Sequence, residues 1–190
     1  MSLLINHSNK WGFVHIPKTG GTSITNILSN VPGTEKLVIH DSIRVFTETQ
    51  NYFIFCFVRN PFTRLASTYY HECRKLNKEI SFGNFIKSIN ENYILYLPQS
   101  YYINSGKGET NQISFIGRYE TYKKDVNYIL KKIGYQHPIP HLNRNPLYDK
   151  HPNLNQEKYY KYIYSEEWMK DWVRERYKND FRIFNYDMDI

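Results

Sequence analysis

The chain has 190 residues, a length that fits one compact domain with a sizeable hydrophobic core. It carries 25 Lys and Arg residues against 18 Asp and Glu residues, and the net charge of +7 favours an anionic partner such as an anionic cofactor, an acidic glycan or nucleic acid. Its two cysteines have neither the spacing of a disulfide scaffold nor that of a zinc site, so both are predicted to be free thiols.

The first residues, MSLLINHSNKWGF, contain no long apolar stretch. A transmembrane helix needs about 20 apolar residues, and the first informative motif begins by residue 15. We therefore expect no transmembrane segment and a cytoplasmic protein.

The first part of the chain alternates short apolar strands with helical patterns. Residues 11–16 form a β-rich run that stops at Pro17, and a glycine pair then leads into a helical pattern over residues 22–30. Residues 36–40 predict a second strand. Residues 52–58 predict a third strand that is apolar on both faces, as is typical of the centre of a parallel sheet covered by helices.

The same alternation continues through the rest of the chain. Asn60 is a predicted N-cap and Pro61 a favoured first residue of a helix that continues to residue 76. Further helices are predicted at residues 81–89, 120–134 and 166–177, and a later strand at residues 113–117. In the last helix Met169, Trp172, Val173 and Tyr177 share one face, which predicts core packing.

Strands that alternate with helices predict an α/β fold. We expect a single domain over residues 1–190, with a central parallel sheet of the P-loop type flanked by helices on both faces. Ligands of such sheets bind beyond the carboxyl ends of the strands. The loops that follow the predicted strands are therefore the places to look for a site.

The loop after the first of these strands, PKTGGTS, has the composition of a phosphate-binding loop. It is a poor Walker A motif, because its lysine precedes the two glycines. The glycines would let backbone N–H groups close on a phosphate at the start of the next helix, the lysine would supply a point charge, and the hydroxyl groups would add donors. The predicted phosphate-binding residues are Lys18, Thr19, Gly20, Gly21, Thr22 and Ser23.

Two segments, HIPKTGGTSI and FCFVRNPFTRLASTY, resemble the two signatures of the sulfotransferases that use 3'-phosphoadenosine-5'-phosphosulfate (PAPS). The resemblance implies that Arg59 and Ser67 hold the 3'-phosphate of the cofactor. Physically, Arg59 at the mouth of a central strand offers a planar fork that suits a phosphate, and Ser67 lies about two turns into the next helix.

Later segments extend the resemblance over nearly the whole chain. GRYETYKKDVNYILKKIG is similar to a strand and helix that line the adenine pocket, which implies contacts from Arg118 and Tyr119. HLNRNPLY, the tyrosine-rich segment and DFRIFNYD are similar to the carbohydrate O-sulfotransferase branch, which includes Golgi glycan sulfotransferases. The resemblance thus implies a carbohydrate or glycoconjugate acceptor and the product PAP. The short, unanchored chain suits a bacterial or viral member with a smaller acceptor.

Sulfuryl transfer needs in-line geometry and stabilisation of charge on the leaving phosphate oxygen, a role that suits Lys18. No carboxylate cluster accompanies the loop, so we expect no metal. His40, at the end of the second predicted strand, is the predicted general base because a histidine titrates near neutrality. The rival bases are Glu35, Asp41 and Glu48. His15 is expected to be a satisfied core residue.

Two other functions remain open at this stage. A P-loop nucleotide kinase should show ordered Walker A glycines and a magnesium carboxylate. A non-catalytic binder of anionic polysaccharide would use the basic surface, without requiring Arg59 and Ser67 to accompany the PKTGGTS loop. Nucleic acid is not expected as a partner. The sequence does not identify the acceptor, which depends on variable loops such as residues 92–112 and 137–153.

Overall fold

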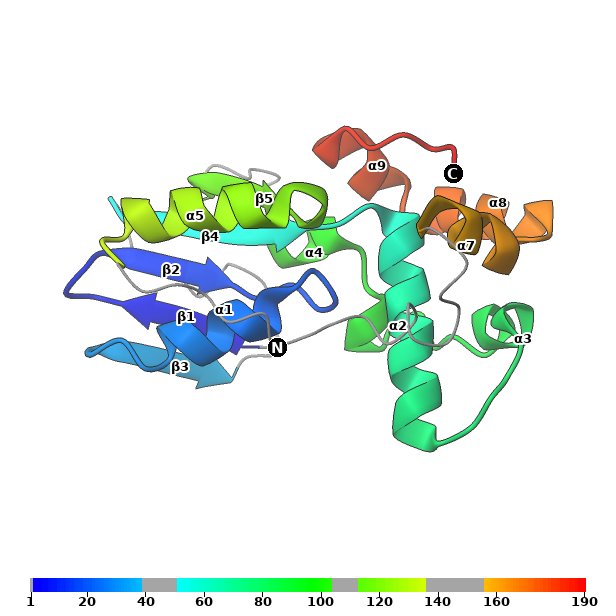
Figure 1. The fold of residues 1–190 in the computed structure, drawn as a ribbon, viewed down its shortest axis with the longest axis horizontal. Helices are drawn as coiled ribbons and strands as arrows, with labels where there is room; N and C mark the ends of the chain where they lie inside the picture. Colours follow the sequence, from blue (N-terminus) through cyan, green and yellow to red (C-terminus); the bar gives the residue numbers. More distant parts are fainter. Residues whose placement is uncertain (1, 39–50, 104–112, 136–155) are drawn as a thin grey trace. The chain divides into compact units, whose positions relative to one another are not determined.

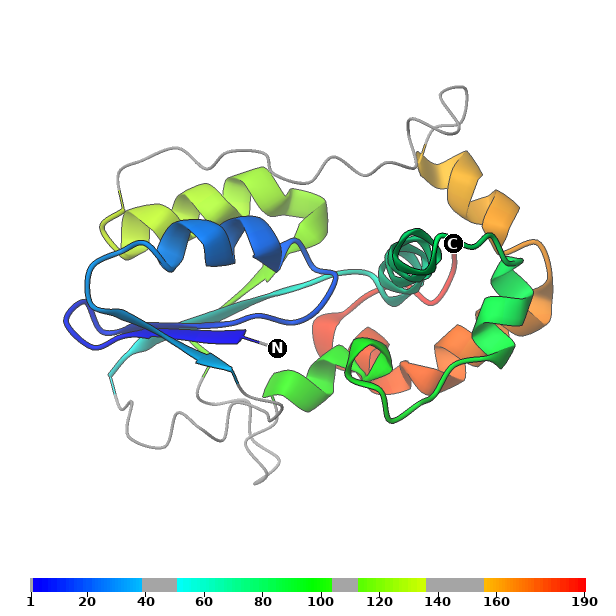
Figure 2. The same cartoon turned by 90° about the horizontal axis from the view of Figure 1, so that it is seen from below.

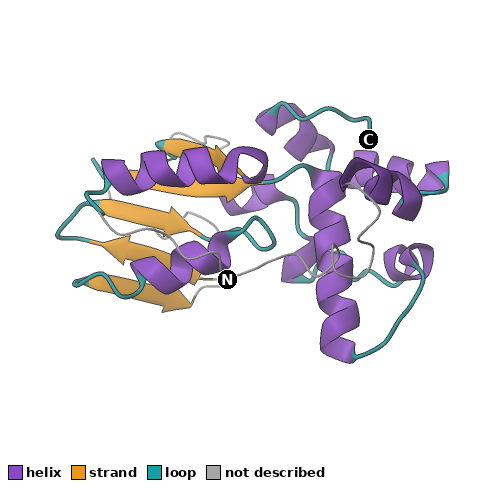
Figure 3. Cartoon of the chain, in the orientation of Figure 1, coloured by secondary structure: helices purple, strands orange, loops and turns teal. Residues whose placement is uncertain are grey.

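The computed structural model describes residues 2–38, 51–103, 113–135 and 156–190. The chain divides into two compact units, the first made of residues 1–59 and 99–143 and the second of residues 60–98 and 144–190. The first unit holds the strands, and the described part of the second is helical (Figure 3). The PKTGGTS loop (residues 17–23), Arg59 and Tyr119 belong to the first unit, whereas Ser67 belongs to the second.

The sheet of the first unit has five strands in the order β3-β1-β2-β4-β5 (Figure 1). The strands are β1 (Ser2–Asn6), β2 (Trp11–Val14), β3 (Thr34–Val38), β4 (Phe53–Val58) and β5 (Phe115–Arg118). β2, β4 and β5 are parallel, but β1 is antiparallel to both of its neighbours. The expectation of a purely parallel sheet is therefore corrected to a mixed sheet, because the sequence analysis missed β1.

Two helices cover one face of this sheet. α1 (Gly21–Leu28) and α5 (Tyr122–Lys132) lie together on that face, and the short helix α4 (Gln99–Ile103) lies on the opposite side (Figure 2). The apolar positions of α1 and α5 recur at helical spacing and pack on aromatic residues of the strands. This core contains Phe13, Phe55, Phe57, Ile24, Ile27, Leu28, Val126, Ile129 and Leu130. β4 is buried from Ile54 to Val58, so its prediction as a strand apolar on both faces is confirmed.

The second unit begins with α2 (Pro61–Leu76), and its start agrees with the sequence prediction. The Asn60 side chain caps the helix, because its Oδ1 accepts a hydrogen bond from the Phe62 N–H at 3.0 Å. Pro61 occupies the first helical position, where a missing N–H costs nothing. Asn77 ends the helix in the left-handed conformation, with φ 48°.

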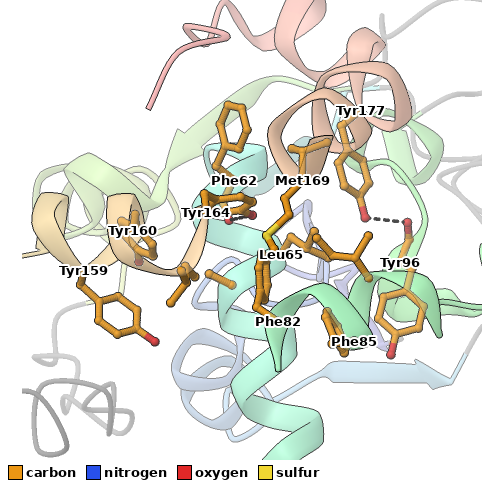
Figure 4. Close-up of a cluster of buried hydrophobic side chains, with 14 of the residues drawn as sticks. Phe62, Leu65, Phe82, Phe85, Tyr96, Tyr159, Tyr160, Tyr164, Met169 and Tyr177 are labelled. Carbon is orange, nitrogen blue, oxygen red and sulfur yellow. Dashed lines mark hydrogen bonds between the residues drawn. The ribbon is translucent and has the colours of Figure 1, made fainter. Parts of the chain in front are cut away.

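An aromatic core joins the helices of the second unit (Figure 4). These helices are α2, α3 (Phe82–Lys87), α7 (Gln156–Ile163), α8 (Glu167–Arg176), α9 (Lys178–Phe184) and the short η2 (Ile94–Tyr96). Met169, Val173 and Tyr177 are buried in this core and Trp172 packs against it, which confirms the predicted stripe. Tyr164 donates to the Phe62 carbonyl at 2.8 Å and Tyr177 to the Tyr96 carbonyl at 3.1 Å. Tyrosine can therefore serve as a core residue here, because its hydroxyl finds a partner.

Both cysteines are free thiols, as expected. Burial raises the pKa of the Cys56 thiol to about 12, so this residue is a small apolar side chain of the core. None of the helices in the described ranges is long and apolar enough to cross a membrane.

Candidate functional site

The predicted site residues of the first unit follow parallel strands that end at one edge of the sheet. β2 ends before the PKTGGTS loop, β4 ends immediately before Arg59, and β5 ends at Arg118. The register pairs Val14 with Cys56 and Val58 with Arg118. Parallel strands therefore bring these segments together at their carboxyl ends, as the sequence predicted.

The loop itself has a tightly curled backbone. Lys18 has φ 68° and Gly20 has φ 89°, so two residues of the loop adopt the left-handed conformation. For a lysine this conformation costs of order 1 kcal/mol, whereas for glycine it costs little. Thr19 lies between them with a fully buried side chain, and its hydroxyl donates to the Ile16 carbonyl at 2.9 Å. Thr19 thus anchors the loop, and its predicted contact with a phosphate stays a prediction.

The loop ends at the N-terminus of α1. Its N-cap residue is Gly20, which has no side chain to accept from the first N–H groups of the helix, and the first turn contains no acidic residue. The positive end of the helix dipole and the N–H groups of the first turn are therefore suited to an external anion. Thr22 is exposed in this turn and Ser23 is buried.

The Arg59 side chain lies against this loop. It is only 3% exposed, its Nη1 lies 3.4 Å from the Lys18 carbonyl oxygen, and its Cζ lies 4.0 Å from the centre of the Tyr119 ring. A cation over an aromatic face is attracted to it. The structure thus brings together Lys18, Arg59 and Tyr119, three residues that the sequence analysis assigned to cofactor binding.

Gln99 holds the backbone of Arg59 in place. The Arg59 N–H donates to Gln99 Oε1, and Gln99 Nε2 donates to the Arg59 carbonyl, both at 2.8 Å. The Gln99 side chain is fully buried, so both hydrogen bonds are shielded from water. Sequence reasoning missed Gln99, because the segment around it matches no motif and its partner is 40 residues away.

Two tyrosines enclose Gly20. Tyr122, the first residue of α5, donates from its hydroxyl to the Gly20 carbonyl at 2.8 Å. A Cβ atom added at Gly20 would lie 2.8 Å from Tyr122 Cε2 and 3.3 Å from Tyr119 Cδ2. Glycine is therefore favoured at position 20 for two reasons: its φ angle is positive, and a larger side chain would collide with the Tyr122 ring. The sequence analysis placed Tyr122 in a helix but gave it no part in the site.

His15 lies beneath the loop, next to Gly21. Its ring occupies the space that a Gly21 side chain would need, and its Nδ1 lies 3.1 Å from Thr25 Oγ1. The pKa of His15 is lowered to about 4, first because burial disfavours the imidazolium and also because Lys36 and Lys18 are positively charged neighbours. The histidine is therefore neutral near pH 7. Its ring has a hydrogen-bond partner, as expected, although the residue is half-buried and does not belong to the buried core.

The start of α5 is held by an acidic residue. Asp125 Oδ2 accepts a hydrogen bond from the Arg118 N–H at 2.8 Å and another from the Thr121 hydroxyl at 2.6 Å. These contacts fix the turn η3 (Tyr119–Thr121), which carries the Tyr119 ring. Tyr119 thus lies on a turn that two hydrogen bonds to Asp125 hold, while the cofactor contact expected of Arg118 stays a prediction.

Other predicted residues are not placed in this site. Ser67 is half-buried on α2 in the second unit, so its partnership with Arg59 stays a prediction. His40, Asp41 and Glu48 lie outside the described residues. Glu35 is exposed on β3. Within the described ranges, no group of three or more His, Cys, Asp or Glu side chains could hold a metal ion.

Comparisons with known proteins show the family of the chain. A family model described as the sulfotransferase family matches residues 1–187. The chain therefore belongs to the sulfotransferase family, whose members transfer sulfuryl groups. It is also 37% identical over 87 residues to an uncharacterized protein of Archaeoglobus fulgidus, a match that covers 44% of this chain and 68% of the relative. No solved structure matches the chain.

Proposed function

We propose that this sulfotransferase uses PAPS as donor and transfers its sulfuryl group to a hydroxyl of a carbohydrate or glycoconjugate. The observation that carries the proposal is the meeting of a phosphate-type loop with the Arg59 guanidinium at one edge of the sheet. A loop alone would suit any phosphate. A buried arginine beside it favours a ligand with a second anionic group.

The fit of PAPS rests on two groups of donors. The first-turn N–H groups of α1 and the Lys18 ammonium suit the 5'-phosphosulfate. The contact between Arg59 and the Lys18 carbonyl, at 3.4 Å, is long for a hydrogen bond, so a 3'-phosphate could replace it with a shorter, charge-assisted one. Tyr119 would keep its ring face beside the guanidinium and line the adenine pocket. Ser67 is proposed as a second contact to the 3'-phosphate.

PAPS supplies an activated sulfuryl group whose leaving group is a phosphate. In our proposal Lys18 and the loop N–H groups stabilise negative charge at that phosphate, and the in-line geometry is set by binding. The acceptor hydroxyl has to lose its proton, and we propose His40 as the base, with Glu35, Asp41 and Glu48 as alternatives. The carbohydrate acceptor, a metal-free reaction and a cytoplasmic location are proposals that rest on the sequence.

Thermal unfolding with nucleotides tests the donor. PAP should raise the melting temperature far more than AMP or ATP, because only PAP carries the 3'-phosphate that Arg59 is proposed to bind. A ligand at one hundred times its dissociation constant adds about 2.7 kcal/mol of stability, which is readily measured. Sulfate transfer from labelled PAPS to a panel of sugars, lipids and phenols then identifies the acceptor class.

The alternatives predict different results in the same experiment. A nucleotide kinase would be stabilised by ATP with magnesium rather than by PAP. A polysaccharide binder would be stabilised by heparin-like chains and by neither nucleotide. Equal shifts with AMP and PAP would contradict the assignment of PAPS.

A further inference from the structure

The peptide between Gly20 and Gly21 joins the loop to α1. The Gly20 carbonyl is positioned by the helix start, where an N-cap carbonyl accepts the first intrahelical hydrogen bond, and by a side chain outside the helix. Turning this peptide over changes ψ of Gly20 and φ of Gly21, and neither residue has a Cβ atom to oppose the change. One orientation directs the Gly21 N–H out of the helix start, and the other puts a carbonyl oxygen there instead. An anion would bind the first and be repelled by the second.

Tyr122 contacts this peptide directly. Its hydroxyl donates to the Gly20 carbonyl at 2.8 Å, although the two residues are 102 positions apart. The Tyr122 ring also packs against Phe57, with 5.2 Å between the ring centres. Burial raises the pKa of Tyr122 to about 12, partly opposed by a hydrogen bond with the Ser23 side chain. The hydroxyl is therefore a protonated donor at every physiological pH.

The carbonyl and the N–H of one trans peptide point in opposite directions, and none of the described peptide bonds is cis. A Gly20 carbonyl held toward Tyr122 therefore directs the Gly21 N–H away from Tyr122. Gly21 is the first residue of α1, so its N–H has no partner within the helix.

We propose that Tyr122 is a positioning residue, which orients the Gly21 N–H toward the 5'-phosphate of the bound nucleotide. This inference rests on the proposed function, because it assumes that the loop binds that phosphate. Tyr122 does not touch the reacting atoms in this proposal. It acts through the peptide whose carbonyl it holds.

Tyr122→Phe is the test, because it removes the hydroxyl and keeps the ring that packs on Gly20 and Phe57. Calorimetric titration should show that affinity for PAP and for AMP falls by the same factor, about three- to tenfold, since both carry a 5'-phosphate. The ratio of the two affinities should stay at the wild-type value. Tyr128→Phe is the matched control, because Tyr128 is an exposed tyrosine of the same helix whose ring packs on Phe115, and both affinities should be unchanged.

A second measurement uses the wild-type chain and does not depend on the folding of a variant. With glycine labelled by ¹⁵N, the Gly21 amide should show a large shift on addition of either PAP or AMP. Unchanged affinities in a folded Tyr122→Phe variant would overturn the positioning role. So would a Gly21 amide whose chemical shift stays the same while PAP and AMP bind. A variant that weakens only PAP would also overturn it, because it would place Tyr122 at the 3'-phosphate.

Failure of the proposed function looks different. A wild-type chain that binds neither PAP nor AMP would remove the premise before any variant is made. A wild-type chain that binds PAP tightly and keeps that affinity in Tyr122→Phe would leave the proposed function intact and reject this inference alone.

Discussion

Arg59 is the residue that, in our proposal, distinguishes nucleotides that differ by one phosphate. Its guanidinium has a planar set of donors, and its backbone is fixed at both ends by Gln99. Its side chain is buried and lies against the Tyr119 ring, which restricts the guanidinium before a ligand arrives and so reduces the conformational entropy lost on binding.

Arg59→Lys keeps the positive charge and removes the planar fork. We expect affinity for PAP to fall at least about tenfold and affinity for AMP to change little, as measured by calorimetric titration. Arg182→Lys, in the second unit, serves as the control and should change neither affinity. Equal losses for PAP and AMP would assign Arg59 to the 5'-phosphate instead.

His15 makes stability depend on pH. Its pKa is about 4 in the folded chain and 6.5 when unperturbed, so between these values the unfolded chain binds a proton that the folded chain does not. The contribution of His15 is fully present above about pH 6.5 and is lost as the pH falls toward 4, by as much as about 3 kcal/mol. In His15→Asn, the free energy of unfolding should therefore change less steeply with pH over this range. Chemical unfolding at several pH values measures both slopes, and identical slopes would contradict the assignment.

At the scale of elements, the α2 cap is the contact whose energy can be stated most directly. Asn60→Ala removes the side-chain acceptor for the Phe62 N–H and should lower the free energy of unfolding by about 1 kcal/mol. Urea unfolding measures the change. Asn127→Ala, at an exposed position inside α5, is the control and should be neutral or slightly stabilising. A loss of stability as large in the control would mean that the cap contributes nothing specific.

Elements with a strong local pattern were predictable from the sequence. The β4 run, the helical spacing of α5 and α8 and the Asn-Pro start of α2 each carry their own signal. β1 does not, because five residues, SLLIN, become a strand only by pairing with β2 and β3. The mixed character of the sheet followed from that one missed element.

For the candidate site too, only residues within a local sequence motif could be predicted. The loop and Arg59 were singled out because their residue types suit phosphate, and Tyr119 because its segment resembles one of the family. The structure brings Arg59 and Tyr119 together beside the loop, and their contacts with a nucleotide stay predictions. Gln99 and Tyr122 were not singled out, because each acts on a backbone group far away in sequence, at separations of 40 and 102 residues. Side chains that support a site through tertiary contacts leave no local pattern.

At the scale of the whole molecule, the chain passes three times between its two units. Each unit has a hydrophobic core of its own, aromatic and aliphatic on the sheet in the first and rich in tyrosine in the second. Arg59 is the last residue of the first unit before one passage, and Gln99 is the first residue after the next. The two hydrogen bonds between Arg59 and Gln99 therefore hold together, within the first unit, the point where the chain leaves that unit and the point where it returns.

The pairing of Arg59 with Gln99 makes the position of the Arg59 backbone independent of much of the chain between these two residues. The direction of the Arg59 backbone depends on the Gln99 amide, and not on the length of the segment that leads to it. The part of the chain between α2 and Gln99 could consequently vary in length without turning the Arg59 backbone, provided that a glutamine follows at the same place. Insertions or deletions in that part of the chain would therefore leave the backbone at the end of β4 where it is.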